Sequence, residues 1–186
     1  MIVSPVAYRY ARSLMELAAS QGRLKDTLED MDLVAGTTRE NRDLVTLLKS
    51  PVVKGDRKSL ILDRIFAGKI GTVTAKFIDI LVRKGRESLL PEVAEAFTRL
   101  YRIEKGIVVV EVRSASPLSE EARRRVRELA EKKHPGKTME IEESVDPQLI
   151  GGVIIRIGDD QFDGSVARRL QDLRRNFSQN PYIPEI

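Results

Sequence analysis

The sequence predicts an α+β protein: an N-terminal all-α bundle of six helices followed by a small α+β domain. Apolar residues recur at helical spacing over residues 1–105, and at Gly106 the period of the apolar pattern changes from 3.6 to 2. The chain has 186 residues, of which 41% are hydrophobic, so two small domains could each bury a core. We therefore expect a bundle over residues 1–105, an α+β domain over residues 106–175 and a flexible tail over residues 176–186.

Six helices separated by short breaks are expected in the bundle. The first begins with Ser4 as N-cap and Pro5 at the first helical position, and it ends at Gly22. The fifth ends near Gly85, a residue suited to the left-handed conformation that closes many helices. The apolar residues of the five later helices lie within residues 24–35, 44–48, 60–66, 73–82 and 89–101. Short loops between six helices indicate a compact bundle.

Strands and helices are expected to mix after Gly106. Residues 107–112 form a β-branched apolar run typical of a strand. Ser116 and Pro117 are expected to begin a helix that ends near His134, and residues 139–145 alternate as a half-exposed strand.

Residues 146–173 complete the domain with a glycine loop, a buried strand, a tight turn and a capped helix. Asp163 and Ser165 supply the capping groups. In this last helix the apolar residues are spaced to bury one face, whereas the polar residues are expected to remain in water. The apolar set is Val166, Leu170 and Leu173, and the polar set is Arg168, Arg169 and Asp172.

The composition argues against the common catalytic and metal sites. The chain has no cysteine and one histidine, His134, which excludes the usual zinc sites and leaves a single ring for any Ser-His-Asp triad. We interpret His134 as the end of a helix. The absence of cysteine is compatible with a reducing compartment.

The glycine-rich segments do not match ligand-binding motifs. Gly136-Lys137-Thr138 resembles the end of a phosphate-binding loop, but Glu131 stands where the motif requires glycine. Gly151, Gly152 and Gly158 do not follow the order of strand, glycine loop and helix that dinucleotide binding needs. Three aspartates between residues 159 and 163 lack the calcium-loop pattern, so we assign them to turns and caps. No cofactor or metal is predicted.

The charge pattern leaves two interpretations open. The net charge is +4, and arginines gather on the expected helices at residues 123–127 and 168–175. These faces are either solvated or a docking surface for an acidic or mixed-charge helix, and a basic helical protein associated with nucleic acid is the alternative function. Aromatic residues make up only 5% of the chain, which argues against base stacking. No apolar run reaches the roughly 20 residues that span a bilayer.

Two helices carry more apolar surface than one buried face needs. The fifth helix is apolar around most of its circumference between residues 73 and 82, and the first adds Tyr8 and Met15 outside its main stripe. Either both helices are central in the bundle, or part of their surface forms a groove for an amphipathic partner helix.

Three segments resemble one known family over nearly the whole chain. They are LIGGVIIRIGDDQFDGSVARRLQDL at residues 149–173, VAYRYARSLMELA at residues 6–18 and KGRESLLPEVAEAF at residues 84–97. They resemble the delta subunit of bacterial F-type ATP synthase, which is similar to the mitochondrial oligomycin-sensitivity-conferring protein. One departure is Asp160-Gln161-Phe162, where relatives usually have a more apolar hairpin.

The resemblance implies a non-catalytic stator subunit in the peripheral stalk of a proton-translocating ATP synthase. In that family the bundle binds the N-terminal helix of an α subunit, and the C-terminal domain joins the b-subunit stalk, so that the catalytic head resists rotor torque. The chain would then lie at the cytoplasmic face of the bacterial inner membrane as a peripheral protein, held there only by the complex. No small-molecule substrate and no nucleic acid is implied.

Candidate site residues follow from the resemblance and from the apolar surplus. For the α-subunit helix we predict Tyr10, Ser13, Leu14, Leu17, Phe77, Ile80 and Leu81, some of which must belong to the bundle core. For the b-subunit stalk we predict the C-terminal sheet and the last helix, including Arg168 and Arg169.

Overall fold

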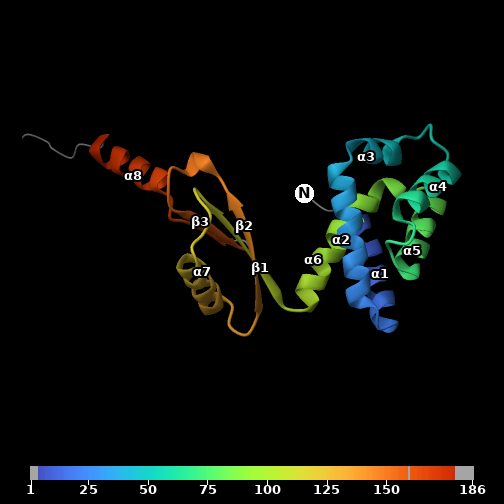
Figure 1. The fold of residues 1–186 in the computed structure, drawn as a ribbon, viewed down its shortest axis with the longest axis horizontal. Coiled ribbons are helices and arrows are strands. Elements are labelled where there is room, and N and C mark those ends of the chain that lie inside the picture. The colour runs from blue at the N-terminus through green and yellow to red at the C-terminus, as the bar shows by residue number, and fades with distance from the viewer. Residues whose placement is uncertain (1–3, 159, 179–186) are drawn as a thin grey trace, which may run out of the picture. The chain divides into compact units, whose positions relative to one another are not determined.

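The computed structural model describes residues 4–158 and 160–178, and the chain divides into two compact units, Met1–Glu104 and Lys105–Ile186. The first unit is helical and the second contains a four-stranded sheet (Figure 1). The α+β class predicted from the change of period at Gly106 is confirmed.

The helical unit contains six α-helices within its described residues 4–104, as predicted. They are α1 (Pro5–Ser20), α2 (Leu24–Glu40), α3 (Arg42–Lys49), α4 (Gly55–Phe66), α5 (Thr72–Arg83) and α6 (Leu90–Glu104), with a 3₁₀ turn at Glu87–Leu89. Ser4 is the N-cap of α1, since its hydroxyl accepts a hydrogen bond from the Ala7 N–H at 3.3 Å. Gly85 has φ 64° and ends α5 in the left-handed region.

The core of this unit is built around α6, against which α1 and α2 pack. Phe97 of α6, Leu14 of α1 and Met31 of α2 are among its fully buried large side chains. Small residues on α1, such as Ala7 and Ala11, let the helices approach closely. The apolar spacing of the sequence thus corresponds to one continuous core.

A buried ion pair ties three elements of the helical unit together. Lys58 of α4 donates to a carboxylate oxygen of Glu87 at 2.5 Å and to the Leu48 carbonyl, at the end of α3, at 2.9 Å. Both side chains are buried, so each charge depends on the other for stabilisation.

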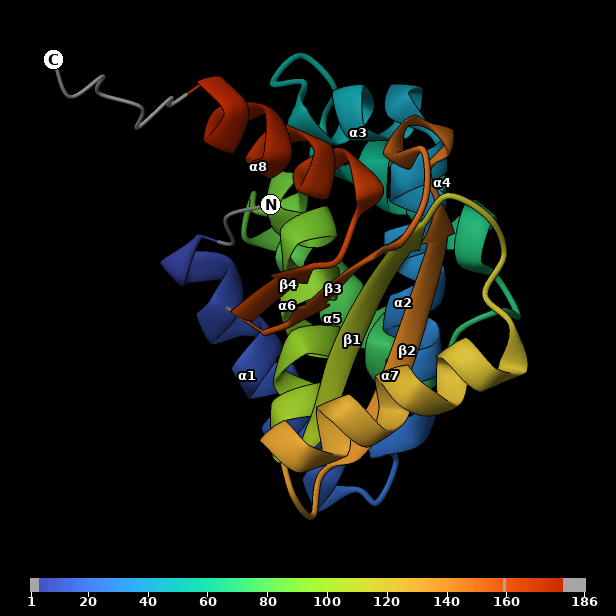
Figure 2. The ribbon, with the colours of Figure 1, turned by 90° about the vertical axis from the view of Figure 1, so that its left-hand side faces the viewer.

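The second unit is a sheet with one helix packed on its face. Its elements are β1 (Ile107–Ser114), α7 (Glu120–Lys133), β2 (Thr138–Val145), a 3₁₀ turn (Pro147–Leu149), β3 (Val153–Ile157), β4 (Asp160–Asp163) and α8 (Val166–Ser178). The strand order is β2-β1-β3-β4, with β1 and β2 parallel and the other pairs antiparallel. Helix α7 crosses one face of the sheet (Figure 2), where Val126 and Ala130 bury against Val110, Val112 and Ile155.

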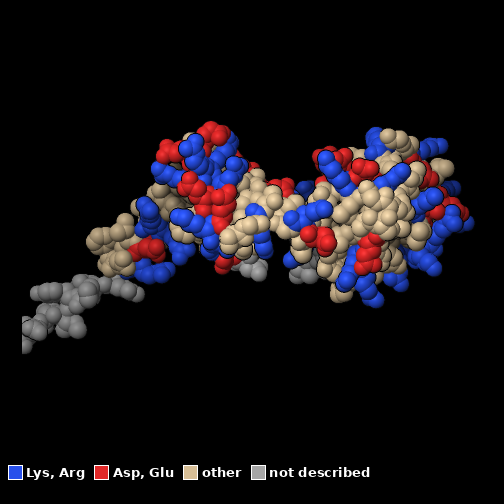
Figure 3. Space-filling model, turned by 90° about the horizontal axis from the view of Figure 1, so that it is seen from below, with Lys and Arg blue, Asp and Glu red and all other residues tan. Residues whose placement is uncertain are grey.

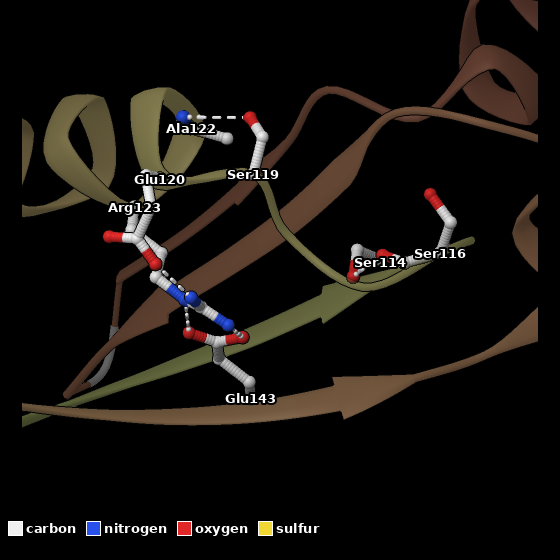
Figure 4. Close-up of polar contacts among 7 residues, drawn as sticks. All are labelled: Ser114, Ser116, Ser119, Glu120, Ala122, Arg123 and Glu143. Atoms are coloured by element: carbon white, nitrogen blue, oxygen red, sulfur yellow. Dashed lines mark hydrogen bonds and ion pairs between the residues drawn. The ribbon is translucent and has the colours of Figure 1, made fainter.

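The start of α7 differs from the expectation of Ser116-Pro117. The N-cap is Ser119, whose hydroxyl accepts from the Ala122 N–H at 3.2 Å (Figure 4). Glu120 and Glu121 fill the first turn. Ser116 lies in the loop, where its carbonyl accepts from the Ser114 hydroxyl at 2.7 Å. Two acidic residues beside the positive end of the helix dipole favour the later start.

The apolar face of α8 is not buried, contrary to expectation. Val166, Leu170 and Leu173 are 38%, 53% and 51% exposed, and Figure 1 shows α8 projecting beyond the sheet. The helix continues to Ser178, so residues 176–178 are helical rather than part of a tail. The remaining predicted tail, residues 179–186, and the predicted turn residue Asp159 lie outside the described residues.

Two glycines bring the loop before β3 against the loop before α8. The Val166 N–H donates to the Gly151 carbonyl at 3.0 Å, and the Gly164 N–H donates to the Val153 carbonyl at 2.9 Å. Gly152 has φ 82°, and a Cβ atom there would overlap the Gly164 carbonyl oxygen. The glycines of this segment therefore serve a close backbone crossing.

Candidate partner-binding surfaces

Three of the seven residues predicted to bind a partner helix lie in the core. Leu14, Phe77 and Leu81 are 1%, 7% and 0% exposed and belong to the main apolar cluster. They can form the floor of a binding surface, but they offer little area of their own. The sequence could not distinguish these buried residues from surface residues, because both kinds recur at the same helical spacing.

Tyr10 links α1 to α5 and to the segment after α5. Its ring meets the Phe77 ring edge-on, with centroids 6.4 Å apart and an interplanar angle of 66°. The Arg86 guanidinium lies 5.6 Å from the centroid of the same ring. Tyr10 and Phe77, predicted separately from two helices, are thus brought together.

An open pocket of about 240 Å³ lies over this contact. Its wall is formed by Val6, Arg9, Tyr10, Ser13 and Arg86. The Ser13 hydroxyl donates to the Arg9 carbonyl at 3.1 Å. Tyr10 and Ser13 were predicted; Val6, Arg9 and Arg86 were not. Helical spacing could have indicated Val6 and Arg9, which lie four residues before Tyr10 and Ser13 on the same face.

Leu17 and Ile80 are large apolar residues left in water, 45% and 50% exposed. Neither residue belongs to the apolar core cluster that contains Phe77. We name the surface formed by the pocket wall together with Leu17 and Ile80 the α1–α5 surface.

Helix α5 is held in place by a residue of α2. The Asp30 carboxylate accepts hydrogen bonds from the Gly71 N–H at 2.9 Å and from the Thr74 hydroxyl at 2.5 Å. Gly71 has no side chain to cap the helix itself, so Asp30 supplies the cap from outside. The exposed side of α5, including Ile80, is therefore fixed relative to the core.

The second unit carries an apolar stripe along α8. Its members recur at helical spacing: Val166, Leu170, Leu173 and Phe177, the last 81% exposed. The predicted residues Arg168 and Arg169 are also exposed; Arg168 is 4.0 Å from Asp163, and its N–H is capped by the Ser165 hydroxyl at 3.2 Å. By helical spacing, Arg169 borders the stripe and Arg168 lies on the far side of the helix.

A second apolar hollow of about 360 Å³ lies between α7 and the β3–β4 hairpin, and sequence reasoning missed it. Leu129 and Phe162 stand at its edge, 37% and 57% exposed, with Val153 and Ile155 deeper. Phe162 is paired with Ile155 across the hairpin, which places it on the α7 side of the sheet. Only the pairing register of β3 and β4 shows that Phe162 lies on the same side of the sheet as α7.

Two arginines of α7, Arg123 and Arg125, form ion pairs within their own unit. Arg123 donates to both carboxylate oxygens of Glu143 on β2, at 2.6 and 3.0 Å, and also to Glu120 (Figure 4). Arg125 pairs with Glu121 at 2.6 Å. The hydrogen bonds from Arg123 lower the pKa of Glu143 below its usual value. Figure 3 shows basic and acidic side chains interspersed on the visible face.

The described residues offer no arrangement for metal chemistry. Among residues 4–158 and 160–178, no three His, Cys, Asp or Glu side chains gather as a metal site. His134 is half-buried at the C-cap of α7, where its N–H donates to the Ala130 carbonyl at 2.9 Å. No helix in these same ranges has both the length and the apolar character needed to cross a membrane.

Comparison with known proteins gives consistent matches. Residues 6–177 match the model of the family described as ATP synthase delta (OSCP) subunit. The chain is 34% identical to the ATP synthase subunit delta of Cytophaga hutchinsonii over 94% of both chains. It is 39% identical to that of Chlorobium luteolum, over 91% of this chain and 93% of the relative.

A solved structure also shares the fold. A chain from the cryo-EM structure of the Toxoplasma gondii mitochondrial ATP synthase hexamer superimposes with a TM-score of 0.69 at 21% identity. The match covers 98% of this chain and 100% of that chain. At this identity the likeness concerns the fold alone.

Proposed function

The chain belongs to the ATP synthase delta (OSCP) subunit family, and from this premise we propose that it is the non-catalytic subunit that joins the catalytic head to the peripheral stalk. The helical unit binds the N-terminal helix of an α subunit, and the second unit binds the end of the b-subunit stalk. The chain reaches the cytoplasmic face of the bacterial membrane through these partners.

The exposed apolar area on α1 and α5 carries the first half of this proposal. Leu17 and Ile80 leave hydrocarbon in water on two helices that also supply buried residues to the core, and an amphipathic helix would cover it. Asp30 fixes α5 against the core, so this surface is formed before the partner arrives. Binding then costs little conformational entropy on this side.

The stripe on α8 supports the second half. Leu170, Leu173 and Phe177 are solvent-exposed along one face of an amphipathic helix, which favours packing against another helix. Arg169 borders the stripe and supplies a charged contact to the stalk. Arg168 lies on the far side of the helix, near Asp163, so we propose a smaller contribution from it. A helical stalk end provides the matching apolar face.

The mechanical task follows from having a partner at each unit. Torque on the head would be resisted by apolar contact at the α1–α5 surface and transmitted through the second unit to the stalk. No reacting group is required in the chain for this task.

The α1–α5 surface is tested by replacing Ile80 with Asp and measuring affinity for a synthetic peptide of the α-subunit N-terminal segment. Burying the exposed half of Ile80 is worth about 1 kcal/mol, and an Asp would also place an unpaired charge in the apolar contact, so we expect binding to weaken at least tenfold. Val52→Asp is the matched control, because Val52 is 87% exposed on the same unit and away from this surface. Unchanged affinity in a folded Ile80→Asp chain would overturn the assignment.

A further inference from the structure

Two arginines in the pocket wall carry charge that the described residues do not neutralise. Neither Arg9 nor Arg86 forms an ion pair within residues 4–158 and 160–178, and the wall contains no acidic residue. The arginines three positions away from each are paired, Arg12 with Glu16 at 3.1 Å and Arg83 with Asp79 at 2.9 Å. The pocket is therefore cationic, whereas these two neighbouring arginines are paired with acids.

Arg86 is positioned before any ligand arrives. Its guanidinium lies 5.6 Å from the centroid of the Tyr10 ring, and Tyr10 is itself held against the buried Phe77. A guanidinium that interacts with a ring through its face keeps its N–H donors at the edge of the plane, where they can form a forked pair with a carboxylate. Pre-positioning lowers the entropy cost of such a pair.

We propose that the pocket binds a carboxylate side chain carried by the docked partner helix, with Arg86 and Arg9 as donors. This inference rests on the proposed function, because the carboxylate must border the apolar face that covers Leu17 and Ile80. The Ser13 hydroxyl is already used on the Arg9 carbonyl, so the arginines are the charged donors available. The partner is thus an amphipathic helix with an Asp or Glu beside its apolar face, recognised by charge as well as by burial.

The experiment uses the full chain and a fluorescent peptide of the α-subunit N-terminal segment, with anisotropy measured at low and high salt. A charge-assisted bond desolvated on docking is worth about tenfold, so we expect that loss for Arg86→Gln, whose guanidinium the Tyr10 ring positions, and about threefold for Arg9→Gln. Arg12→Gln and Arg83→Gln are the matched controls and should change affinity less than about twofold, because exposed pairs contribute little. Arg86→Lys should fall between, since it keeps the charge but loses the fork.

A double-mutant cycle between Arg86 and the acidic residues of the peptide identifies the carboxylate that Arg86 binds. Each acidic residue of the peptide is replaced in turn by its amide, and one such peptide should bind the native chain more weakly and lose nothing further on Arg86→Gln. Additive losses for every peptide, or an Arg86→Gln affinity equal to that of Arg83→Gln, would overturn the carboxylate assignment.

The outcomes separate this inference from the proposed function. Binding that Ile80→Asp removes but that Arg9→Gln and Arg86→Gln leave unchanged would keep the function and overturn the inference. A native chain that does not bind the peptide would overturn both. Inorganic phosphate is the second probe: if phosphate binds the free chain through Arg86 and no peptide acid couples to Arg86, the pocket is a site for free anions instead.

Discussion

The Asp30 carboxylate of α2 accepts a hydrogen bond from the Thr74 hydroxyl of α5 at 2.5 Å, and the same oxygen accepts the Gly71 N–H. This contact caps the helix that carries Ile80. Asp30→Ala should lower the free energy of unfolding by about 2 kcal/mol, because the cap is lost and the buried Thr74 hydroxyl is left without its acceptor. Urea unfolding and hydrogen exchange of the α5 amides measure the effect. Glu29→Ala, an exposed neighbour, is the control; equal stability of the two variants would refute the capping role.

Lys58 and Glu87 form the buried ion pair of the helical unit. Lys58→Met should cost about 3–5 kcal/mol in unfolding free energy, because Glu87 would be left buried without its counter-charge. The double variant Lys58→Met/Glu87→Gln should recover much of this loss. Arg57→Met, at an exposed position beside Lys58, should have an effect within about 0.5 kcal/mol. Denaturant titration measures the unfolding free energy of each variant. A double variant no more stable than Lys58→Met would show that the unpaired Glu87 charge is not the cause of the loss.

Gly152 and Gly158 both have positive φ, 82° and 59°, but only Gly152 is crowded. Gly158→Ala adds a Cβ in open space and should cost about 1 kcal/mol, the penalty of the left-handed conformation. Gly152→Ala must also displace the backbone of Gly164 and Ser165, so we expect about 3 kcal/mol or more. Hydrogen exchange in β3, followed by mass spectrometry, compares the two variants. Similar protection in both would show that the loops separate easily.

The Arg123–Glu143 pair makes the second unit sensitive to acid. Because the pKa of Glu143 in the folded chain is lowered below the unfolded value of about 4.3, the pair contributes stability above that value and loses it as pH falls through the folded-state pKa. Glu143→Gln should therefore be less stable than the native chain at pH 7, and the difference should shrink in acid. Thermal unfolding against pH tests this, with Glu131→Gln as the control. A stability difference between Glu143→Gln and the native chain that grows as pH falls would contradict this prediction.

Replacing Leu170 and Leu173 together with Gln should leave the unfolding free energy nearly unchanged, since both side chains are already half exposed. Under the proposed function the same variant should bind a C-terminal fragment of the b subunit at least tenfold more weakly, because apolar area is no longer buried. Calorimetric titration measures the affinity. Asp172→Asn, on another face of α8, is the control. Native affinity in the double variant would remove α8 from the stalk contact.

Local signals in the sequence located most elements of the fold. Ser4 caps α1 as predicted, Gly85 ends α5, and the strand after Gly106 begins at Ile107. These signals are local because caps and turns depend on a few neighbouring residues. The start of α7 was misplaced at Ser116 because two serines three positions apart can each cap a helix, and the acidic residues after Ser119 favour the second.

The candidate surfaces depended on contacts that one sequence does not encode locally. An amphipathic pattern such as that of α8 shows that a face will be covered, but the same pattern serves burial within a chain and burial against a partner. Arg86 could not be assigned to the pocket because only the tertiary structure brings it over Tyr10. Phe77 and Ile80 lie on the same helix, but Phe77 is 7% exposed and belongs to the core, whereas Ile80 is 50% exposed and lies on the surface.

The exposed apolar stripe on α8 also limits how many unassembled copies of this subunit a cell can tolerate. Free copies would carry Leu170, Leu173 and Phe177 in water, where apolar patches promote self-association and attract proteases and chaperones. Copies made in excess of their assembly sites would be cleared or would aggregate. We therefore expect synthesis of this subunit to be matched in number to the complexes it enters.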